Sequence, residues 1–239
     1  PANFPPTASE ATTLSGMGTP DLQGGYGTFT WFTDEPAART RDVSGGRIER
    51  VEVFEHVVEC SLRGPVNEFS ADQAQATVRL IVYRDPQEDV VRIVVQDRTL
   101  ILKAGEWSDW VVVKFSLLPY VVTASGICRL YLKSVHEPFG LYVSPINIDP
   151  ADPSLPLTTP PNYSKRFVRE LDYFYTQDLV EDTHALTHGV LDADEYREQA
   201  MFVHDERMRF FEHELARFRG GFLFFYFSSL DLSSYMFWR

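Results

Sequence analysis

Residues 46–148 carry short runs of β-branched and other apolar residues, separated by turn residues. The clearest runs are Ala76–Tyr83, Val90–Val95 and Trp110–Phe115, each six to eight residues long. No helical period intervenes between them, which favours short strands joined by turns. This pattern predicts an antiparallel, sandwich-like β domain or a curled sheet.

From about residue 162 the apolar period becomes helical. The spacing of Phe167, Leu171 and Phe174 predicts one amphipathic helix, and a second piece is expected over Leu179–Leu186. The third helix is the clearest, because Asp192 and the glutamate three residues later form a capping-box pattern. It is expected to end at the two glycines at 220 and 221.

Two segments lack a regular period. Residues 1–45 are rich in Gly, Pro, Thr and Ser and are expected to pack irregularly on a core, with one short strand near Gly27–Phe32. Residues 149–161 are dense in proline and predict a semi-rigid linker. The predicted organisation is therefore 1–45 irregular, 46–148 β-rich, 149–161 linker and 162–239 helical, an α+β chain.

One apolar run does not fit this scheme. Phe222–Phe227 is six apolar or aromatic residues in a row, a pattern typical of a strand buried on both faces of a parallel sheet. No other run in the C-terminal region offers a parallel partner. One interpretation places this strand at the edge of the β region or in a hydrophobic groove. The other is that the chain is a fragment of an α/β core whose other strands lie outside it.

Composition narrows the function classes. Among the 239 residues, 22 basic residues against 34 acidic ones give a net charge of −12, which argues against a nucleic-acid partner. An acidic protein can still process phosphate compounds where metal ions supply positive charge. No apolar run approaches the roughly 18 to 20 residues of a membrane span.

The compartment stays open, cytoplasmic or extracytoplasmic. Cys60 and Cys128 lie in strand-like runs and are expected to be buried free thiols, with a disulfide as the alternative. The first residues have neither a basic region nor an apolar stretch of the kind found in signal peptides. We expect that the chain begins inside a longer polypeptide rather than after a removed signal.

Several residues are candidates for chemistry. Asp231 follows the buried-strand candidate at the position where α/β sheets place their ligands, so it could bind a metal or act as a base; it could also cap a helix over 232–238. His184 and His188 are four residues apart, as in a zinc pair, but Ala185 stands where a zincin motif has glutamate. Surface or partly buried histidines, near the acidic Glu181 and Asp182, are the alternative.

Two further features have a binding and a packing interpretation. The glycine-rich segment from Gly16 to Gly27 could border a substrate cleft, although packing is the simpler expectation. Trp107 and Trp110 could stack on sugars if exposed, or pack in the β core.

The C-terminal stretch Gly221–Arg239 resembles the strand and metal loop of the alkaline phosphatase superfamily, and more closely the type I phosphodiesterase/nucleotide pyrophosphatase-like proteins. In that family an apolar strand runs into Asp, three further residues and His. Further segments also look like that group's bacterial hydrolases: Phe4-Pro5-Pro6, Ser15–Asp21, Tyr142–Pro150 and Tyr175-Thr176-Gln177. The resemblance implies an alkaline-phosphatase-like core with the β region as an insertion.

The resemblance also implies a mechanism. Two divalent metals, usually zinc, would activate a Thr or Ser nucleophile for in-line displacement at phosphorus. Asp231 would be one metal ligand. Tyr235 stands where the family has its His ligand, and a neutral phenol is a poor zinc ligand beside an imidazole.

The family's nucleophile lies upstream of this stretch and its remaining ligands downstream. We therefore expect the chain alone to be inactive and to hold no metal tightly, with the remainder of the polypeptide as its partner and a small phosphate ester as substrate. The leading hypothesis is a fragment of such a hydrolase. The alternatives are a non-catalytic β module that binds carbohydrate or protein, a structural module, or a pseudoenzyme given Tyr235.

Overall fold

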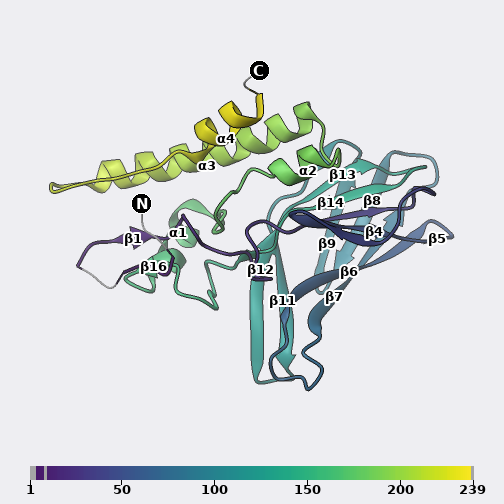
Figure 1. The fold of residues 1–239 in the computed structure, drawn as a ribbon, viewed down its shortest axis with the longest axis horizontal. Coiled ribbons are helices and arrows are strands. Elements are labelled where there is room, and N and C mark those ends of the chain that lie inside the picture. The colour runs from purple at the N-terminus through teal and green to yellow at the C-terminus, as the bar shows by residue number, and fades with distance from the viewer. Residues whose placement is uncertain (1–3, 8–9, 238–239) are drawn as a thin grey trace. The chain divides into compact units, whose positions relative to one another are not determined.

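The computed structural model describes residues 4–7 and 10–237 and divides the chain into two compact units. The β unit is Asp21–Asp149, and the helical unit joins Pro1–Pro20 to Pro150–Arg239. The fold is mixed α+β with several antiparallel sheets, and within the described residues none of the sheets closes into a barrel (Figure 1). The α+β class with antiparallel sheets is thus confirmed.

The β unit holds three sheets within the described residues. A six-stranded sheet has the order β10-β13-β14-β2-β4-β3, a five-stranded sheet runs β5-β6-β7-β8-β9, and a three-stranded sheet is β11-β12-β15. The strands are β2 (Phe29–Thr33), β3 (Arg41–Val43), β4 (Gly46–Arg50), β5 (Val53–Phe54), β6 (Val57–Val66), β7 (Gln75–Arg84), β8 (Val90–Val95), β9 (Arg98–Lys103), β10 (Glu106–Trp107), β11 (Val111–Leu118), β12 (Val122–Cys128), β13 (Leu130–Ser134), β14 (Gly140–Val143) and β15 (Asn147–Ile148).

Alternation explains why these runs form sheets. In β6 and β7 every second side chain is buried, and the burial continues into β8 through Val91, Ile93 and Val95. The opposite faces of β6 and β7 carry polar residues, so each strand has one core face and one solvent face. The predicted runs at 76–83 and 90–95 are confirmed as β7 and β8.

Two details of the β unit differ from the expected pattern. The apolar stretch 127–132 is divided at Arg129 between β12 and β13, which belong to different sheets. The strand near Gly27–Phe32 is β2, and it pairs in parallel with β4 rather than antiparallel with it. Parallel pairing requires a crossover connection, and residues 34–45, which include β3, supply it.

The prediction of two buried free thiols is confirmed. Burial raises the pKa of the Cys128 thiol to about 12. Burial, and secondarily the negative charge of Glu49, raises the pKa of the Cys60 thiol as well. Both residues therefore serve the core as small apolar side chains.

The helical unit contains α1 (Tyr163–Leu171), α2 (Thr183–Thr187), α3 (Ala193–Arg217), α4 (Ser228–Phe237) and a short antiparallel pair of β1 (Thr13–Leu14) with β16 (Thr158–Thr159). The predicted capping box is present: the Asp192 carboxylate accepts from the Asp194 and Glu195 amides, and Glu195 accepts from the Asp192 amide. No helix of the described residues is both long and apolar enough to cross a membrane.

Aromatic packing joins α1 to α3. Phe167, Phe174 and Phe210 form a buried cluster, with ring centroids 4.8 Å apart between Phe210 and each of the other two. Leu14 and Phe225 pack against this cluster from two other parts of the chain. The cluster is one apolar core of the helical unit, and it packs α1 against α3.

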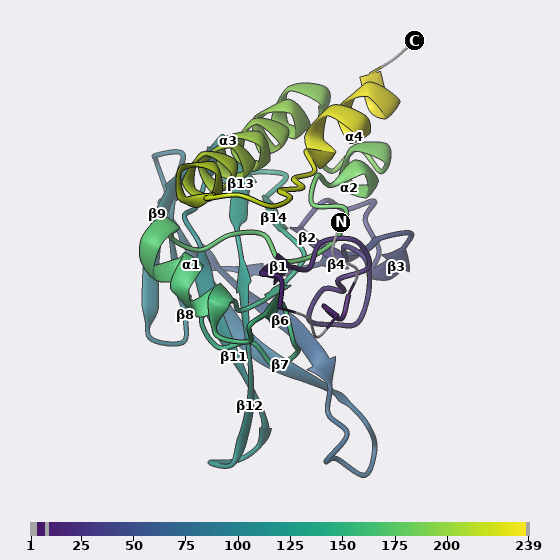
Figure 2. The ribbon, with the colours of Figure 1, turned by 90° about the vertical axis from the view of Figure 1, so that its left-hand side faces the viewer.

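The predicted strand at Phe222–Phe227, buried on both faces, is wrong for this structure. The segment is extended but pairs with no strand, and it runs back along α3 between that helix and α4 (Figure 2). Its side chains alternate between half-buried and exposed, with Phe222 at 87% exposure and Phe224 at 50%. The reason is that only one of its faces has something to pack against, namely α3.

A close approach in the β unit generates the first prediction. A Cβ atom added to Gly64 would lie 2.3 Å from the ring of the fully buried Phe115. Replacing Gly64 with Ala should lower the free energy of unfolding by roughly 1–3 kcal/mol, because the ring cannot yield without disturbing the core. Urea denaturation measures the change.

The control is Gly16→Ala. A Cβ atom there meets nothing within 4 Å, so this variant should stay within about 0.5 kcal/mol of the parent. Equal stability of the Gly64→Ala variant and the parent would show that the β-unit core is looser than described.

Candidate functional site

The predicted metal ligand, Asp231, lies in the first turn of α4 with its side chain exposed. The Tyr226 hydroxyl donates to its Oδ2 at 3.3 Å. Tyr235 follows one helical turn later and is 83% exposed. Residues four apart share one face of a helix, so Asp231 and Tyr235 both lie on the solvent side of α4. The alternative role of Asp231 as an N-cap is wrong, because α4 begins three residues earlier, at Ser228.

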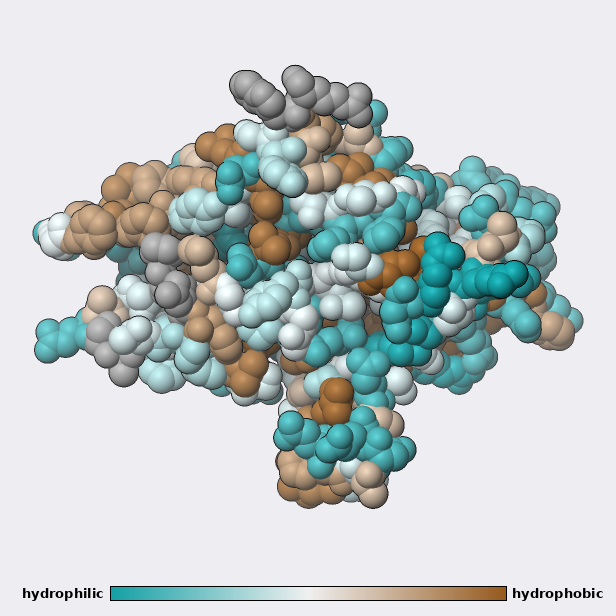
Figure 3. All heavy atoms as spheres, viewed as in Figure 1, coloured by the Kyte–Doolittle hydropathy of each residue, from teal (hydrophilic) through white to brown (hydrophobic). Residues whose placement is uncertain are grey.

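The extended segment before α4 presents two different faces. Phe225 and Phe227 pack on Phe211 of α3, with ring centroids 5.5 and 5.6 Å away. The opposite face exposes Phe222, Phe224 and Tyr226. This exposed face contributes to the apolar band at the upper left of Figure 3. Within the described residues, the backbone of this segment makes no hydrogen bond to another segment.

A buried acidic group lies close to α4. Glu181 is only 1% exposed, and its carboxylate oxygens make no hydrogen bond of normal geometry within the described part of the chain. Burial raises its pKa, and the Ser229 hydroxyl and the positive charge of Arg207 offset the shift only in part. Glu181 and Asp182 are therefore both buried and do not form a solvated polar face.

The surroundings of Glu181 are polar as well as buried. Asp182 caps α2 by accepting from the Ala185 amide, and its own amide donates to Gln199 Oε1 at 2.9 Å. The Tyr196 hydroxyl and the Ser229 Oγ, both buried, make no hydrogen bond of normal geometry among the described residues. A buried polar cluster with this many unmet hydrogen bonds is a place where water or a small ligand can bind.

Negative charge also gathers around the Tyr226 phenol. Partial burial raises its pKa, and the negative charges of Asp231, Asp178 and Glu181 raise it further. Even so, the described residues contain no group of three or more His, Cys, Asp or Glu side chains arranged to hold a metal ion. Asp231 is an exposed carboxylate on α4.

Among the described residues, His184 and His188 belong to no group of three or more side chains that could hold a metal ion. His184 is half-buried within α2, and His188 is the exposed C-cap residue of that helix, where its amide bonds to the His184 carbonyl. The two tryptophans pack against neighbouring side chains of the β unit. Trp107 lies 4.8 Å from the Tyr131 ring, and the Arg129 guanidinium lies over Trp110 at 4.7 Å.

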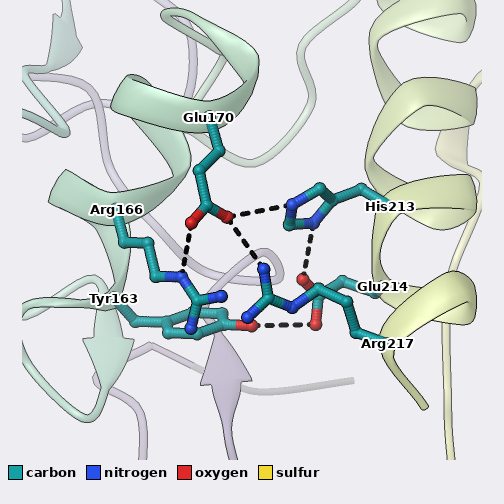
Figure 4. A network of polar contacts seen from close by, with 6 residues as sticks. All are labelled: Tyr163, Arg166, Glu170, His213, Glu214 and Arg217. Carbon is teal, nitrogen blue, oxygen red and sulfur yellow. Dashed lines mark hydrogen bonds and ion pairs between the residues drawn. The ribbon is translucent and has the colours of Figure 1, made fainter.

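A polar network links α1 to α3 (Figure 4). His213 contacts Glu170 at 3.0 Å and Glu214 at 2.9 Å, one carboxylate at each ring nitrogen. Glu170 also accepts from Arg166 at 2.8 Å and from Arg217 at 3.1 Å. These arginine and histidine contacts, led by the Arg166 hydrogen bond, lower the pKa of Glu170.

The Tyr163 phenol is the last member of this network. The Tyr163 hydroxyl donates to Glu214 at 2.9 Å, and its pKa is raised, first by burial and then by this hydrogen bond. Because the charged groups of the network face one another across the two helices, its role is to position α3 against α1. Sequence reasoning missed it, since nothing in the spacing shows that residues 163–170 meet residues 213–217.

Comparison with known proteins found no matching family model, no matching curated protein and no matching solved structure. The resemblance to the alkaline phosphatase superfamily therefore stays a hypothesis that depends on the quoted residues.

The buried acid generates the second prediction. The native state holds the Glu181 proton to a higher pH than the unfolded state does, so ionisation above the ordinary glutamate pKa, about 4.3, costs native stability. Replacing Glu181 with Gln should raise the free energy of unfolding by about 1–3 kcal/mol at neutral pH. The gain should vanish below about pH 4, where both states are protonated.

The matched control is Glu198→Gln, which alters an exposed carboxylate of the same unit. It should leave the pH profile of unfolding unchanged. A Glu181→Gln variant that is less stable than the parent at neutral pH would show that the carboxylate has a favourable partner in solution.

Proposed function

We propose that this chain supplies part of the core of a two-metal phosphodiesterase or nucleotide pyrophosphatase-like hydrolase, with Asp231 as one metal ligand. The observation that supports it most is the arrangement of residues 222–237. An extended apolar segment with an unpaired backbone leads directly into a helix that exposes Asp231 in its first turn. In α/β sheets the ligands bind just beyond the carboxyl ends of the strands, so an acidic residue shortly after an extended apolar segment suits such a position.

The open face of Phe222–Phe227 indicates what the segment lacks. Its backbone groups and its Phe222, Phe224 and Tyr226 side chains need strands and helices to cover them. In the proposal, the remainder of the polypeptide supplies that sheet, the Thr or Ser nucleophile and the other metal ligands. The metals, zinc by analogy, would hold the phosphoryl oxygens and activate the nucleophile.

The contribution of this chain to the metal site is one carboxylate. Tyr235 lies one turn after Asp231 on the same exposed face of α4, where the proposed family has its imidazole. A phenol in place of that ligand should weaken metal binding, so a low-activity enzyme or a pseudoenzyme belongs to the same proposal.

A non-catalytic binding module is the second candidate function. It is favoured by a polar pocket in the β unit, lined by two arginines and two glutamines and separate from Asp231. The two functions can coexist in one protein, because they use different units of the chain.

The third prediction concerns Asp231 in the complete encoded polypeptide. Asp231→Asn should lower the bound metal from about two ions per chain towards one, and should reduce hydrolysis of an aryl phosphodiester at least about 100-fold. The measurements are elemental metal analysis and release of the aryl alcohol. Asp205→Asn, at an exposed position of α3, is the control and should change neither quantity.

The outcome that would contradict the proposal is an Asp231→Asn protein with unchanged metal content and activity, or a complete parent polypeptide that binds no divalent metal. The reciprocal variant Tyr235→His should raise metal occupancy, because imidazole replaces a phenol one turn after Asp231. No gain in occupancy would contradict the ligand assignment for this face of α4.

A further inference from the structure

The β unit contains a pocket of about 320 Å³ that the proposed hydrolase does not use. It is formed where β2, β3 and β4 of one sheet meet β6 and β7 of another. The lining residues are Gln23, Thr28, Thr30, Asp42, Val43, Gly45, Gly46, Arg47, Arg63 and Gln75. The volume falls at the lower end of the range for small-molecule sites, roughly 300–1,000 Å³, which suits a ligand the size of one sugar ring.

The lining of this pocket holds two cationic side chains and one anionic one, and Glu49 approaches Arg47 from outside the lining. Two guanidinium groups, Arg47 and Arg63, face one carboxylate, Asp42, although the chain carries a net charge of −12. A planar guanidinium binds carboxylates and phosphates through paired hydrogen bonds, so such a pocket favours an anion.

Arg47 is fixed by one hydrogen bond and keeps a further N–H group that can donate. Its Nη1 donates to Asp42 Oδ1 at 2.6 Å, and its side chain is 15% exposed. Its Nε is buried and has no hydrogen-bond partner among the described residues; the nearest acid oxygen, from Glu49, is 3.8 Å away. A buried guanidinium nitrogen without a partner is costly unless a water or ligand meets it.

Arg63 is the cation with the most freedom to bind. Its Nη1 donates a long hydrogen bond, 3.4 Å, to Gln75 Oε1. A β-bulge follows it, between Arg63 and Val66, and bulges of this kind redirect side chains at the edge of a sheet. On the same outward face of the sheet, Arg79 is instead paired with Glu59.

The remaining wall is built by the loop before β2. The buried Asp21 carboxylate accepts from the backbone amides of Gln23, Gly25 and Thr28. A Cβ atom on Gly25 would lie 2.6 Å from Thr28 Oγ1, so the loop closes only with glycine there. The glycine-rich segment thus borders a pocket, and it delivers Gln23 and Thr28 to the wall.

We propose that this pocket binds a small hydroxylated anion, the chemistry shared by sugar acids and sugar phosphates. Arg63, together with Arg47, holds the carboxylate or phosphate group. The amides of Gln23 and Gln75, the Thr28 and Thr30 hydroxyls and Asp42 supply donors and acceptors for the ligand hydroxyls. The proposal is independent of Asp231 and of any hydrolase activity.

Isothermal titration of the chain with four probes provides the test: D-glucuronate, glucose 6-phosphate, D-glucose and inorganic phosphate. We expect glucuronate or glucose 6-phosphate to bind, and the one that binds more tightly identifies the anionic group. Arg63→Met should weaken that binding about ten- to a hundredfold, because a hydrogen bond to a charged group is lost. Arg79→Met, which removes a cation from the same sheet face, is the matched control and should leave the affinity unchanged.

Folding is checked separately, since Arg63 lies beside a bulge. Gln23→Ala alters the loop side of the pocket and removes one long hydrogen bond, 3.3 Å, that Gln75 Nε2 of β7 donates to Gln23 Oε1. It should also weaken binding, while both variants keep the thermal midpoint of the parent within a few degrees. Four outcomes would overturn the proposal: neither anion binds, D-glucose binds as well as the anions, inorganic phosphate alone binds, or the Arg63→Met variant with the parent's thermal midpoint binds as tightly as the parent.

Discussion

Backbone hydrogen bonding is the constraint that shapes the end of the helical unit. An extended apolar segment needs partners for its amides and carbonyls, and Phe222–Phe227 has none within the described residues. It is held only by side-chain packing of one face on α3, through Phe225 and Phe227. The other face leaves three aromatic residues exposed, a costly arrangement for a protein in water. This imbalance is the physical basis of the proposal that the segment belongs to a larger sheet.

The rest of the helical unit provides a rigid platform for that segment. The aromatic cluster around Phe167 and the polar network around Glu170 and His213 both join α1 to α3. Because α3 is fixed in this way, the extended segment and α4 return along a defined path, with Asp231 towards solvent and Ser229 towards the buried Glu181. Glu181 is kept at a cost in stability, and buried acids with raised pKa values concentrate at functional sites.

Much of the fold could be predicted from the sequence, because the deciding signals are local. Alternation in β7 and β8 and the capping box at Asp192 are short-range patterns, and each element formed where expected. The prediction of a strand at Phe222–Phe227 was wrong because hydrophobicity shows what a segment can bury, and does not show whether a partner strand is present. The burial of Glu181 could not be predicted, because its surroundings include Ser229 of α4, almost fifty residues later in the chain.

The candidate sites were less predictable than the fold. Asp231 could be proposed from the sequence because it comes four residues after an apolar run, which is a local signal. The Arg47 and Arg63 pocket was missed, since its walls come from the loop before β2 and from two sheets that only tertiary structure brings together. The glycine-rich loop was the one available hint, but glycine content alone does not show what a loop encloses.

Hydrogen exchange of the Phe222–Phe227 amides tests the central claim most directly. We compare this chain alone with the complete encoded polypeptide, both under native conditions. If the segment is a strand that needs the rest of a larger sheet, its amides exchange rapidly in the chain alone and are protected in the complete polypeptide. Amides that are already protected in the chain alone, or that exchange equally fast in both, would contradict the account.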